Sequence, residues 1–199
     1  MQHIARQLHA TLLEAGQILL IPHQHPDGDA VGSLSAIREW LLSIGKVPMA
    51  YCATDAPARF SYLPGASDIK KNPEVWKRSF DAIVVFDSGD LRYAGVEGEL
   101  AALLPRPKIL NIDHHATNEG YGDINFVDKT ASSTAEMVYR FFSMNRVRVT
   151  PTMATCLMTG LMTDTDQFTN AATSRASLAV GSRLMSIGAN LSQVQGLNF

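Results

Sequence analysis

Three apolar runs constrain the fold of this chain, and each of them ends in acidic or histidine residues. The runs cover residues 17–21, 81–86 and 107–112. Their length and their Ile, Val and Leu content are typical of buried strands. Residues with helical periodicity separate them, and this alternation predicts a three-layer α/β fold, a mainly parallel sheet with helices on both faces. The chemistry of such sheets collects beyond the carboxyl ends of the strands.

The polar residues that follow these runs form one candidate site. The first run leads into the spacing H-x-x-x-D-x-D, the second ends in one aspartate, and the third ends in Asp-His-His: His23, Asp27, Asp29, Asp87, Asp113, His114 and His115. Carboxylate oxygen and imidazole nitrogen are ligands for a hard or borderline divalent cation. For the first stretch alone, a merely polar turn with Asp29 as a helix cap is the alternative. A merely polar turn does not explain why three strands bring such residues to one edge of the sheet.

The carboxylates are too numerous for a single zinc ion, which takes four ligands and prefers nitrogen and sulfur. Asp164, grouped with the strand-end residues, completes a set of four candidate ligand carboxylates: Asp27, Asp29, Asp87 and Asp164. Their four negative charges match two divalent cations. Mn²⁺ suits this mixture of oxygen and imidazole ligands best, and Mg²⁺ or Co²⁺ are the alternatives.

The remaining elements are predicted from periodicity and cap signals. Helices are expected over residues 2–15, 30–44, from about 132 to 142, 155–161 and 173–188, and further strands over 47–52 and 124–127. In the last helix, Leu178, Leu184 and Ile187 are expected to face inward.

Ser133 and Glu136 form a capping-box pattern at the start of the third expected helix. The N–H groups of a helix N-terminus suit an anion such as phosphate, so Ser132 and Ser133 are candidate phosphate contacts. A plain helix cap explains the same spacing equally well. Lys129 and Arg92 are the cationic candidates near these motifs for gripping a phosphate.

The composition is typical of a globular protein. The chain has 199 residues, of which 46% are hydrophobic, and a formal net charge of −2, so one globular domain is expected and non-specific DNA binding is not indicated. The two cysteines lie in apolar stretches, which fits a reducing compartment. No apolar run approaches the roughly 20 residues of a membrane span, and the N-terminus lacks a signal-peptide layout. A cytoplasmic location without membrane contact is therefore expected.

The motifs together resemble the DHH phosphoesterase superfamily. The resemblance rests on H-x-x-P-D-G-D-A-x-G-S from His23 to Ser33, on Asp87, on Asp113-His114-His115 and on Thr163-Asp164-Thr165, in this order. Within the superfamily, Gly28 and the Ala30-x-Gly32-Ser33 continuation are similar to the RecJ-like oligoribonuclease and pAp-phosphatase branch. Family II pyrophosphatases usually have Asn at the position of His25 and Thr at that of Gly28.

The resemblance implies a role for each matching residue. One ion would be held by His23, Asp27 and Asp87, and the other by Asp29, Asp87, His114 and Asp164, with Asp87 as the bridge. His115 would contact the scissile phosphate, and Asp113 would orient a histidine from behind the ligands. Asp166 departs from the small or apolar residue that the family often has there, so its part in the metal site is left open.

The implied activity is hydrolysis of short single-stranded oligonucleotides or pAp-like nucleotides by a water molecule that two Mn²⁺ ions activate. The alternatives are a cyclic- or linear-dinucleotide phosphodiesterase, a family II-type pyrophosphatase and a nucleotide-binding domain without catalysis. No serine has the G-x-S-x-G context of a nucleophile. The resemblance also implies a catalytic domain over residues 1–188 and the start of a linker helix at 189–199, with a second, substrate-gripping domain absent. The sequence leaves the oligomeric state open, and a homodimer is one alternative.

Overall fold

The computed structural model describes residues 1–195 and contains a five-stranded sheet whose neighbouring strands are all parallel. The strand order is β2-β1-β3-β4-β5, with bounds β1 (Ile18–Pro22), β2 (Met49–Ala50), β3 (Ala82–Phe86), β4 (Lys108–Asp113) and β5 (Ile124–Val127). Leu20 pairs with Val84 and Val84 with Leu110, so the three central strands run level with one another. The predicted parallel α/β sheet is confirmed.

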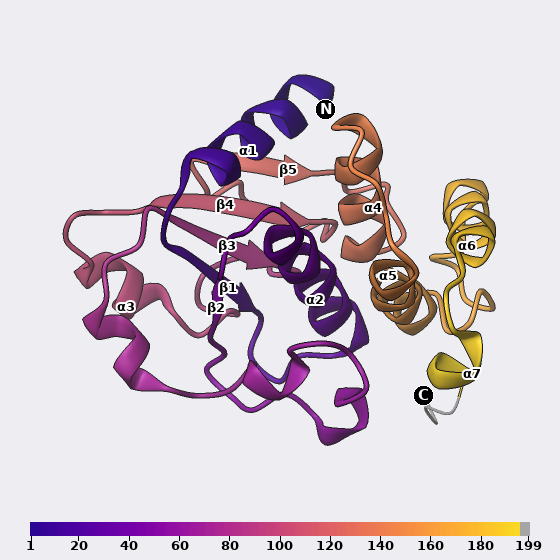
Figure 1. Ribbon diagram of the computed structural model, residues 1–199, viewed down its shortest axis with the longest axis horizontal. Helices are drawn as coiled ribbons and strands as arrows, with labels where there is room; N and C mark the ends of the chain where they lie inside the picture. Colours follow the sequence, from indigo (N-terminus) through magenta and orange to yellow (C-terminus); the bar gives the residue numbers. More distant parts are fainter. Residues whose placement is uncertain (196–199) are drawn as a thin grey trace.

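Seven α-helices accompany the sheet in the described part of the chain: α1 (Gln2–Glu14), α2 (Gly28–Ser43), α3 (Glu97–Ala102), α4 (Thr134–Met144), α5 (Pro151–Asp164), α6 (Arg175–Ile187) and α7 (Leu191–Gln195). Figure 1 shows the arrows of β4 and β5 pointing toward α4, with α6 and α7 outside α5. The carboxyl ends of β3 and β4 lie at the N-terminus of α4 and the C-terminus of α5, because Thr134 bonds to Asp87 and His114 lies 3.0 Å from Asp164.

Helices and turns cover both faces of the sheet. On one face, Leu20, Val84 and Leu110 pack in a large core with α1, α2, α4 and α5. On the other face, Ile83 belongs to a smaller core that also contains Phe80 and residues at and before α3. Because alternate side chains of a buried strand point to opposite faces, continuous apolar runs were required for both cores.

Two sequence predictions about the C-terminal helices are wrong. Asp164 does not end a strand, because α5 runs from Pro151 to Asp164 and makes it the last helical residue. The helix begins where Thr150 accepts a hydrogen bond from the N–H of Met153, and Pro151 occupies the first turn. In α6, Leu178 is 52% exposed rather than inward, whereas Leu184 is buried as expected.

The C-terminal range 189–199, which the sequence predicts as the start of a linker helix, contains α7, and residues 196–199 lie outside the described residues. Over residues 1–195, no helix combines the length and apolar character needed to cross a bilayer.

Glycines allow α2 and α5 to cross closely. A Cβ atom at Gly32 would overlap the backbone carbonyl of Cys156, and one at Gly160 would lie 2.5 Å from Oδ1 of Asp29. Only a residue without a side chain permits such an approach of two helix backbones. The crossing brings the C-terminus of α5 to the N-terminus of α2, which places Asp164 near Asp29.

Candidate metal centre

The turn after β1 sets the first ligand candidates in place. His25 has a left-handed backbone with φ 54°, and its N–H donates to Oγ1 of Thr54 over 2.6 Å. Asp27 then caps α2, because its Oδ1 accepts from the N–H groups of Asp29 and Ala30 at 2.9 and 3.1 Å. The helix cap is therefore Asp27, and Asp29 lies fully buried in the first turn.

Asp87 lies between two histidines. It follows β3 in a left-handed conformation with φ 58° and is 2% exposed. Its Oδ2 lies 3.6 Å from Nε2 of His23, and its Oδ1 lies 3.5 Å from Nε2 of His114. One carboxylate thus presents a different oxygen to each histidine.

The potential ligands around this aspartate form three groups, one of which joins Asp87 and His114 to Asp113 and His115. The other two groups contain the six predicted ligands. In the first, ligand atoms of His23, Asp27 and Asp87 lie within 4.8 Å of one another. In the second, the same holds for Asp29, His114 and Asp164. Within it, Nε2 of His114 is 3.0 Å from Oδ2 of Asp164 and 3.9 Å from Oδ2 of Asp29. The structure brings together all six residues that the sequence predicts as ligands.

The hydrogen bonds of both histidines leave Nε2 free for a cation. Nδ1 of His23 lies 2.8 Å from the carbonyl oxygen of Gln24, and Nδ1 of His114 lies 3.3 Å from that of Ala131. A backbone carbonyl only accepts, so the ring proton belongs on Nδ1 in each case. Nε2 of His114 is buried and makes no hydrogen bond within residues 1–195, although it is surrounded by carboxylate oxygens. This donor set fits a divalent cation.

The clustered carboxylates also shift the pKa values of their neighbours in the way expected for a cation site. Burial lowers the pKa of His114, but Asp164 and Asp87 together raise it to about 12. Burial likewise lowers the pKa of His23, and Asp27 and Asp87 raise it to about 11. Burial and the charge of Asp164 hold the pKa of Asp29 well above its usual value. Without a cation, protons on these groups supply the positive charge, and a cation bound at Nε2 would take the place of the second ring proton.

His115 differs from its neighbour His114 in its partner and its exposure. Its Nδ1 lies 2.7 Å from Oδ1 of Asp113, and the side chain is 39% exposed. Asp113 is fully buried, and its Oδ2 accepts from the Nδ2 amide of Asn118 over 2.6 Å. The Asp113 hydrogen bond raises the pKa of His115. This bond orients His115 with Nε2 as the nitrogen that can meet a bound molecule.

Sequence reasoning missed Thr134, at the start of α4. Its N–H donates to Oδ2 of Asp29 over 2.6 Å, and its hydroxyl donates to Oδ1 of Asp87 over 2.9 Å. The N–H of Ala135 donates to Oδ1 of Asp29 over 2.8 Å. Thr134 therefore fixes one carboxylate from each ligand group. No local spacing signals this role, because Asp29 lies 105 residues away.

These bonds also bear on the predicted phosphate contacts. The anion at the N-terminus of α4 is the Asp29 carboxylate. Ser133 caps the helix by accepting from the N–H of Glu136, and the Ser132 hydroxyl donates to the carbonyl of Ala172. Both serines are buried, so the geometry gives no support to a phosphate contact there, and that contact stays a prediction.

The other residues singled out in the sequence lie outside the ligand groups. Lys129 is exposed, and the exposed Arg92 pairs with Glu97 at 3.2 Å. Asp166 is exposed and accepts from the hydroxyl of Thr169 at 3.2 Å. In this conformation Asp166 does not compete with Asp164 for a cation.

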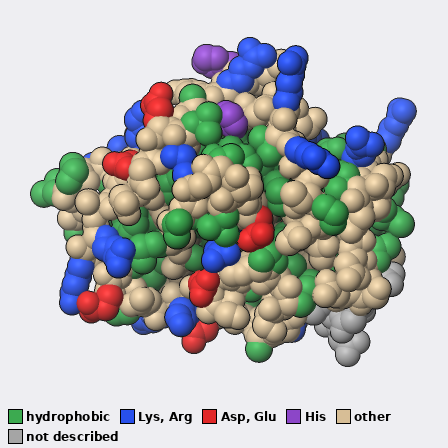
Figure 2. All heavy atoms as spheres, viewed as in Figure 1, with side chains coloured by type: hydrophobic (Ala, Val, Ile, Leu, Met, Phe, Trp, Pro, Cys, Tyr) green, Lys and Arg blue, Asp and Glu red, His purple; other side chains and the backbone are tan. Residues whose placement is uncertain are grey.

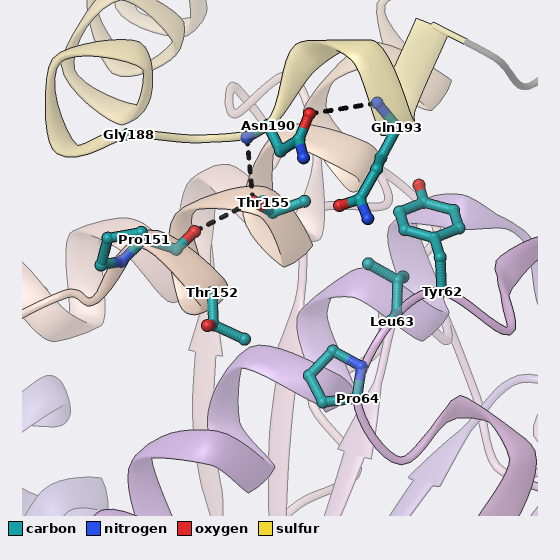
Figure 3. A pocket seen from close by; sticks show the side chains of 9 residues that line it. All are labelled: Tyr62, Leu63, Pro64, Pro151, Thr152, Thr155, Gly188, Asn190 and Gln193. Carbon is teal, nitrogen blue, oxygen red and sulfur yellow. Dashed lines mark hydrogen bonds between the residues drawn. The ribbon is translucent and has the colours of Figure 1, made fainter.

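A separate pocket of about 400 Å³ lies between α5, α7 and the segment around Tyr62. Figure 3 shows that its polar groups bond to neighbouring chain atoms: the N–H of Asn190 donates to Oγ1 of Thr155 over 3.0 Å. The Tyr62 hydroxyl lies 2.7 Å from that of Thr159. Among the described residues, the lining contains no carboxylate or imidazole, so this pocket is not the metal centre.

Comparison with known proteins identifies the family. The model of the DHH family, N-terminal domain, matches residues 17–161. The chain belongs to the DHH family. Its residues are 31% identical to the bifunctional oligoribonuclease and PAP phosphatase NrnA of Thermus thermophilus, over 94% of this chain and 56% of that protein. The cyclic-di-AMP phosphodiesterase GdpP of Geobacillus thermodenitrificans is 26% identical, over 98% of this chain and 31% of the relative.

Solved structures agree with this DHH assignment. An exopolyphosphatase-related protein from Bacteroides fragilis superposes with a TM-score of 0.88 at 26% identity, over 98% of this chain and 59% of the other. RecJ from Thermus thermophilus, in complex with Mn²⁺, shares the fold with a TM-score of 0.52 at 15% identity, over 90% of this chain and 26% of the other. The DHH chain spans about half the length of the first curated relatives it matches, 56% and 52%.

Proposed function

We propose that this DHH chain forms the catalytic part of a phosphoesterase that hydrolyses short oligonucleotides and pAp-like nucleotides with two divalent cations. The arrangement of Asp87 carries the proposal, because its two oxygens face the histidines of two separate ligand groups. The named activities of the Thermus relative support the choice of substrate class.

We infer that one cation is held by His23, Asp27 and Asp87 and the other by Asp29, Asp87, His114 and Asp164. Mn²⁺ suits mixed carboxylate and imidazole ligands, and the RecJ neighbour was crystallised with Mn²⁺. Bound divalent ions would lower the pKa of water and offset negative charge on a phosphate.

The residues around the ligands have supporting tasks in this proposal. His115 donates a hydrogen bond from Nε2 to a phosphate oxygen, while Asp113 holds its ring in that orientation. Thr134 keeps Asp29 and Asp87 in position through the bonds described above. Water is the proposed nucleophile, and Ser132 and Ser133 at the start of α4 are buried in hydrogen bonds of the fold.

Hydrolysis assays on matched substrates test the proposal. With Mn²⁺ present, the chain is expected to hydrolyse pAp and a linear dinucleotide faster than pyrophosphate, and chelation is expected to stop the reaction. Asp87→Asn removes the bridging charge and serves as the inactive comparison. Equal turnover by the Asp87→Asn variant would refute the assignment of the site, and a preference for pyrophosphate would refute the substrate class.

A second candidate is hydrolysis of cyclic dinucleotides. The resemblance to the Geobacillus phosphodiesterase over 98% of this chain favours it. Including cyclic di-AMP in the same assay separates the two candidates, since both share the metal centre and differ in the preferred phosphodiester.

A further inference from the structure

A pocket of about 300 Å³ lies at the ends of α4 and α5 that point away from the metal centre. Arg146 and Arg148, from the connection between these helices, line it together with Arg183 of α6. Because α4 has 11 residues, its two ends are ~16 Å apart. The pocket is therefore separate from the ligand groups at the N-terminus of α4.

The three guanidinium groups lack acidic partners. None of them forms an ion pair within residues 1–195, and no residue that lines the pocket is acidic. From residue 137 to residue 199 the sequence contains only two acidic residues, Asp164 and Asp166. Figure 2 shows Lys and Arg side chains over the region of α4 and α6 with no Asp or Glu among them. This local positive charge suits an anionic ligand.

The backbone at Arg146 gives a second observation. This residue has φ 56°, a left-handed conformation in which glycine is the usual residue after a helix. Its N–H and that of Val147 close the end of α4 by donating to Ser143 and Phe142 carbonyls at 3.2 and 2.9 Å. A helix C-terminus attracts a cation, but that attraction does not require a third arginine on α6. The fold alone would favour glycine at position 146.

We propose that this pocket binds the phosphate backbone of a single-stranded nucleic acid, as a second site remote from the metal centre. Arginine forks bind phosphate oxygens in a bidentate manner. Tyr139 supplies an aromatic ring beside them, and Val147 and Ile187 supply apolar surface for a base. An acidic peptide would use the arginines but has no base for the ring. Binding of nucleic acid at this pocket would be a second property of the chain, independent of the proposed hydrolysis.

Fluorescence anisotropy with a labelled five-nucleotide single-stranded RNA tests this site, in EDTA so that no hydrolysis occurs. The double variant Arg146→Gly/Arg183→Gln is expected to bind at least tenfold more weakly at low salt. If two phosphate contacts are lost, the plot of log association constant against log salt concentration should become less steep, its negative slope shrinking in magnitude by about 1.4. Arg78→Gln is the matched control, since Arg78 is exposed and also lacks an ion pair among the described residues, and its affinity should stay within twofold.

The single variant Arg146→Gly separates binding from folding. Glycine adopts this backbone freely, so its melting temperature should equal or exceed that of the unmodified chain while its RNA affinity falls. The proposal is overturned if the double variant binds RNA unchanged, if Arg78→Gln loses as much, or if hexaglutamate binds more tightly than the RNA. A fall in melting temperature for Arg146→Gly would assign this arginine to the fold instead. If the unmodified chain binds the RNA at this pocket but hydrolyses no nucleotide substrate, only the catalytic proposal is contradicted.

Discussion

Asp87 presents one oxygen to His23 and the other to His114, so its removal should affect both cation sites. Asp87→Ala is expected to abolish nearly all Mn²⁺ binding. Asp27→Ala should leave one ion, because Asp27 belongs only to the group of His23. Calorimetric titration with Mn²⁺ measures the number of ions bound.

His25→Ala provides the control for these variants. His25 is an exposed imidazole two residues from His23 and belongs to neither ligand group, so this variant should still bind two ions. Two ions bound by Asp87→Ala would contradict the bridging assignment.

His115 and His114 are adjacent in sequence but are expected to respond differently to substitution. His115→Ala should keep both ions and lose ~10²–10³ in kcat, the usual cost of removing one hydrogen-bond donor to an oxygen that gains negative charge. His114→Ala should instead lose an ion, since its Nε2 is surrounded by carboxylate oxygens. Metal titration together with steady-state kinetics tests this difference. Loss of an ion in His115→Ala would place this residue among the ligands.

At the scale of the elements, the crossing of α2 and α5 is the feature most sensitive to added volume. Gly32→Ala would force the helices apart, because a Cβ there overlaps the backbone of Cys156. We expect this substitution to lower the free energy of unfolding by ~1–3 kcal/mol and to weaken Mn²⁺ binding by moving Asp164. Urea denaturation and metal titration measure the two effects.

Gly98 offers a matched control in another helix. No atom lies within 4 Å of a Cβ built there, so Gly98→Ala, in the first turn of α3, should not lower the free energy of unfolding. Equal losses in both variants would mean that the close approach of α2 and α5 is not what Gly32 provides.

The start of α4 is anchored by a charged network that should make stability depend on pH. Arg140 contacts Glu136 and also pairs with Asp128 at 2.7 Å. Hydrogen bonds from Thr130, and then Arg140, lower the pKa of Asp128. The ionised carboxylate thus stabilises the fold above the usual aspartate pKa, and this contribution is lost as pH falls through the lowered value.

Asp128→Asn is accordingly expected to reduce the urea midpoint at pH 7. The difference from the unmodified chain should shrink as pH falls below roughly 4, where the carboxyl of the unfolded chain takes up a proton, and should vanish below the lowered pKa of the folded chain. A difference that stayed constant down to pH 2 would show that the charge of Asp128 does not matter.

Local sequence signals predicted the strands and most ligand candidates, but not the contacts between distant elements. The runs at 17–21, 81–86 and 107–112 match β1, β3 and β4 because buried parallel strands need continuous apolar residues. Ser133 was identified as a cap from its spacing to Glu136. The bond from Thr134 to Asp29 was missed because it joins residues 105 positions apart. The extent of α5 was missed although Thr150 and Pro151 are a helix start signal.

For the whole molecule, cation binding should add stability. A ligand that binds only the folded state stabilises it by about 2.7 kcal/mol at one hundred times its Kd. The melting temperature is therefore expected to rise with Mn²⁺ and to fall on chelation. Asp87→Asn should lose this dependence. Identical melting curves with Mn²⁺ and with chelator would argue against a preformed metal site.

The position of Asp164 on α5 also has a consequence for synthesis on the ribosome. Asp87 and Asp164 are 77 residues apart (164 minus 87), which corresponds to a delay of ~4–15 s at usual elongation rates. During that time the emerging chain has neither α5 nor, at first, the α4 N-terminus to hold Asp29 and Asp87. We expect full cation capture only after residue 164 has left the exit tunnel. Stalled nascent chains that expose residues 1–145 should therefore retain less Mn²⁺ than those that expose 1–195, and equal retention would contradict this order of assembly.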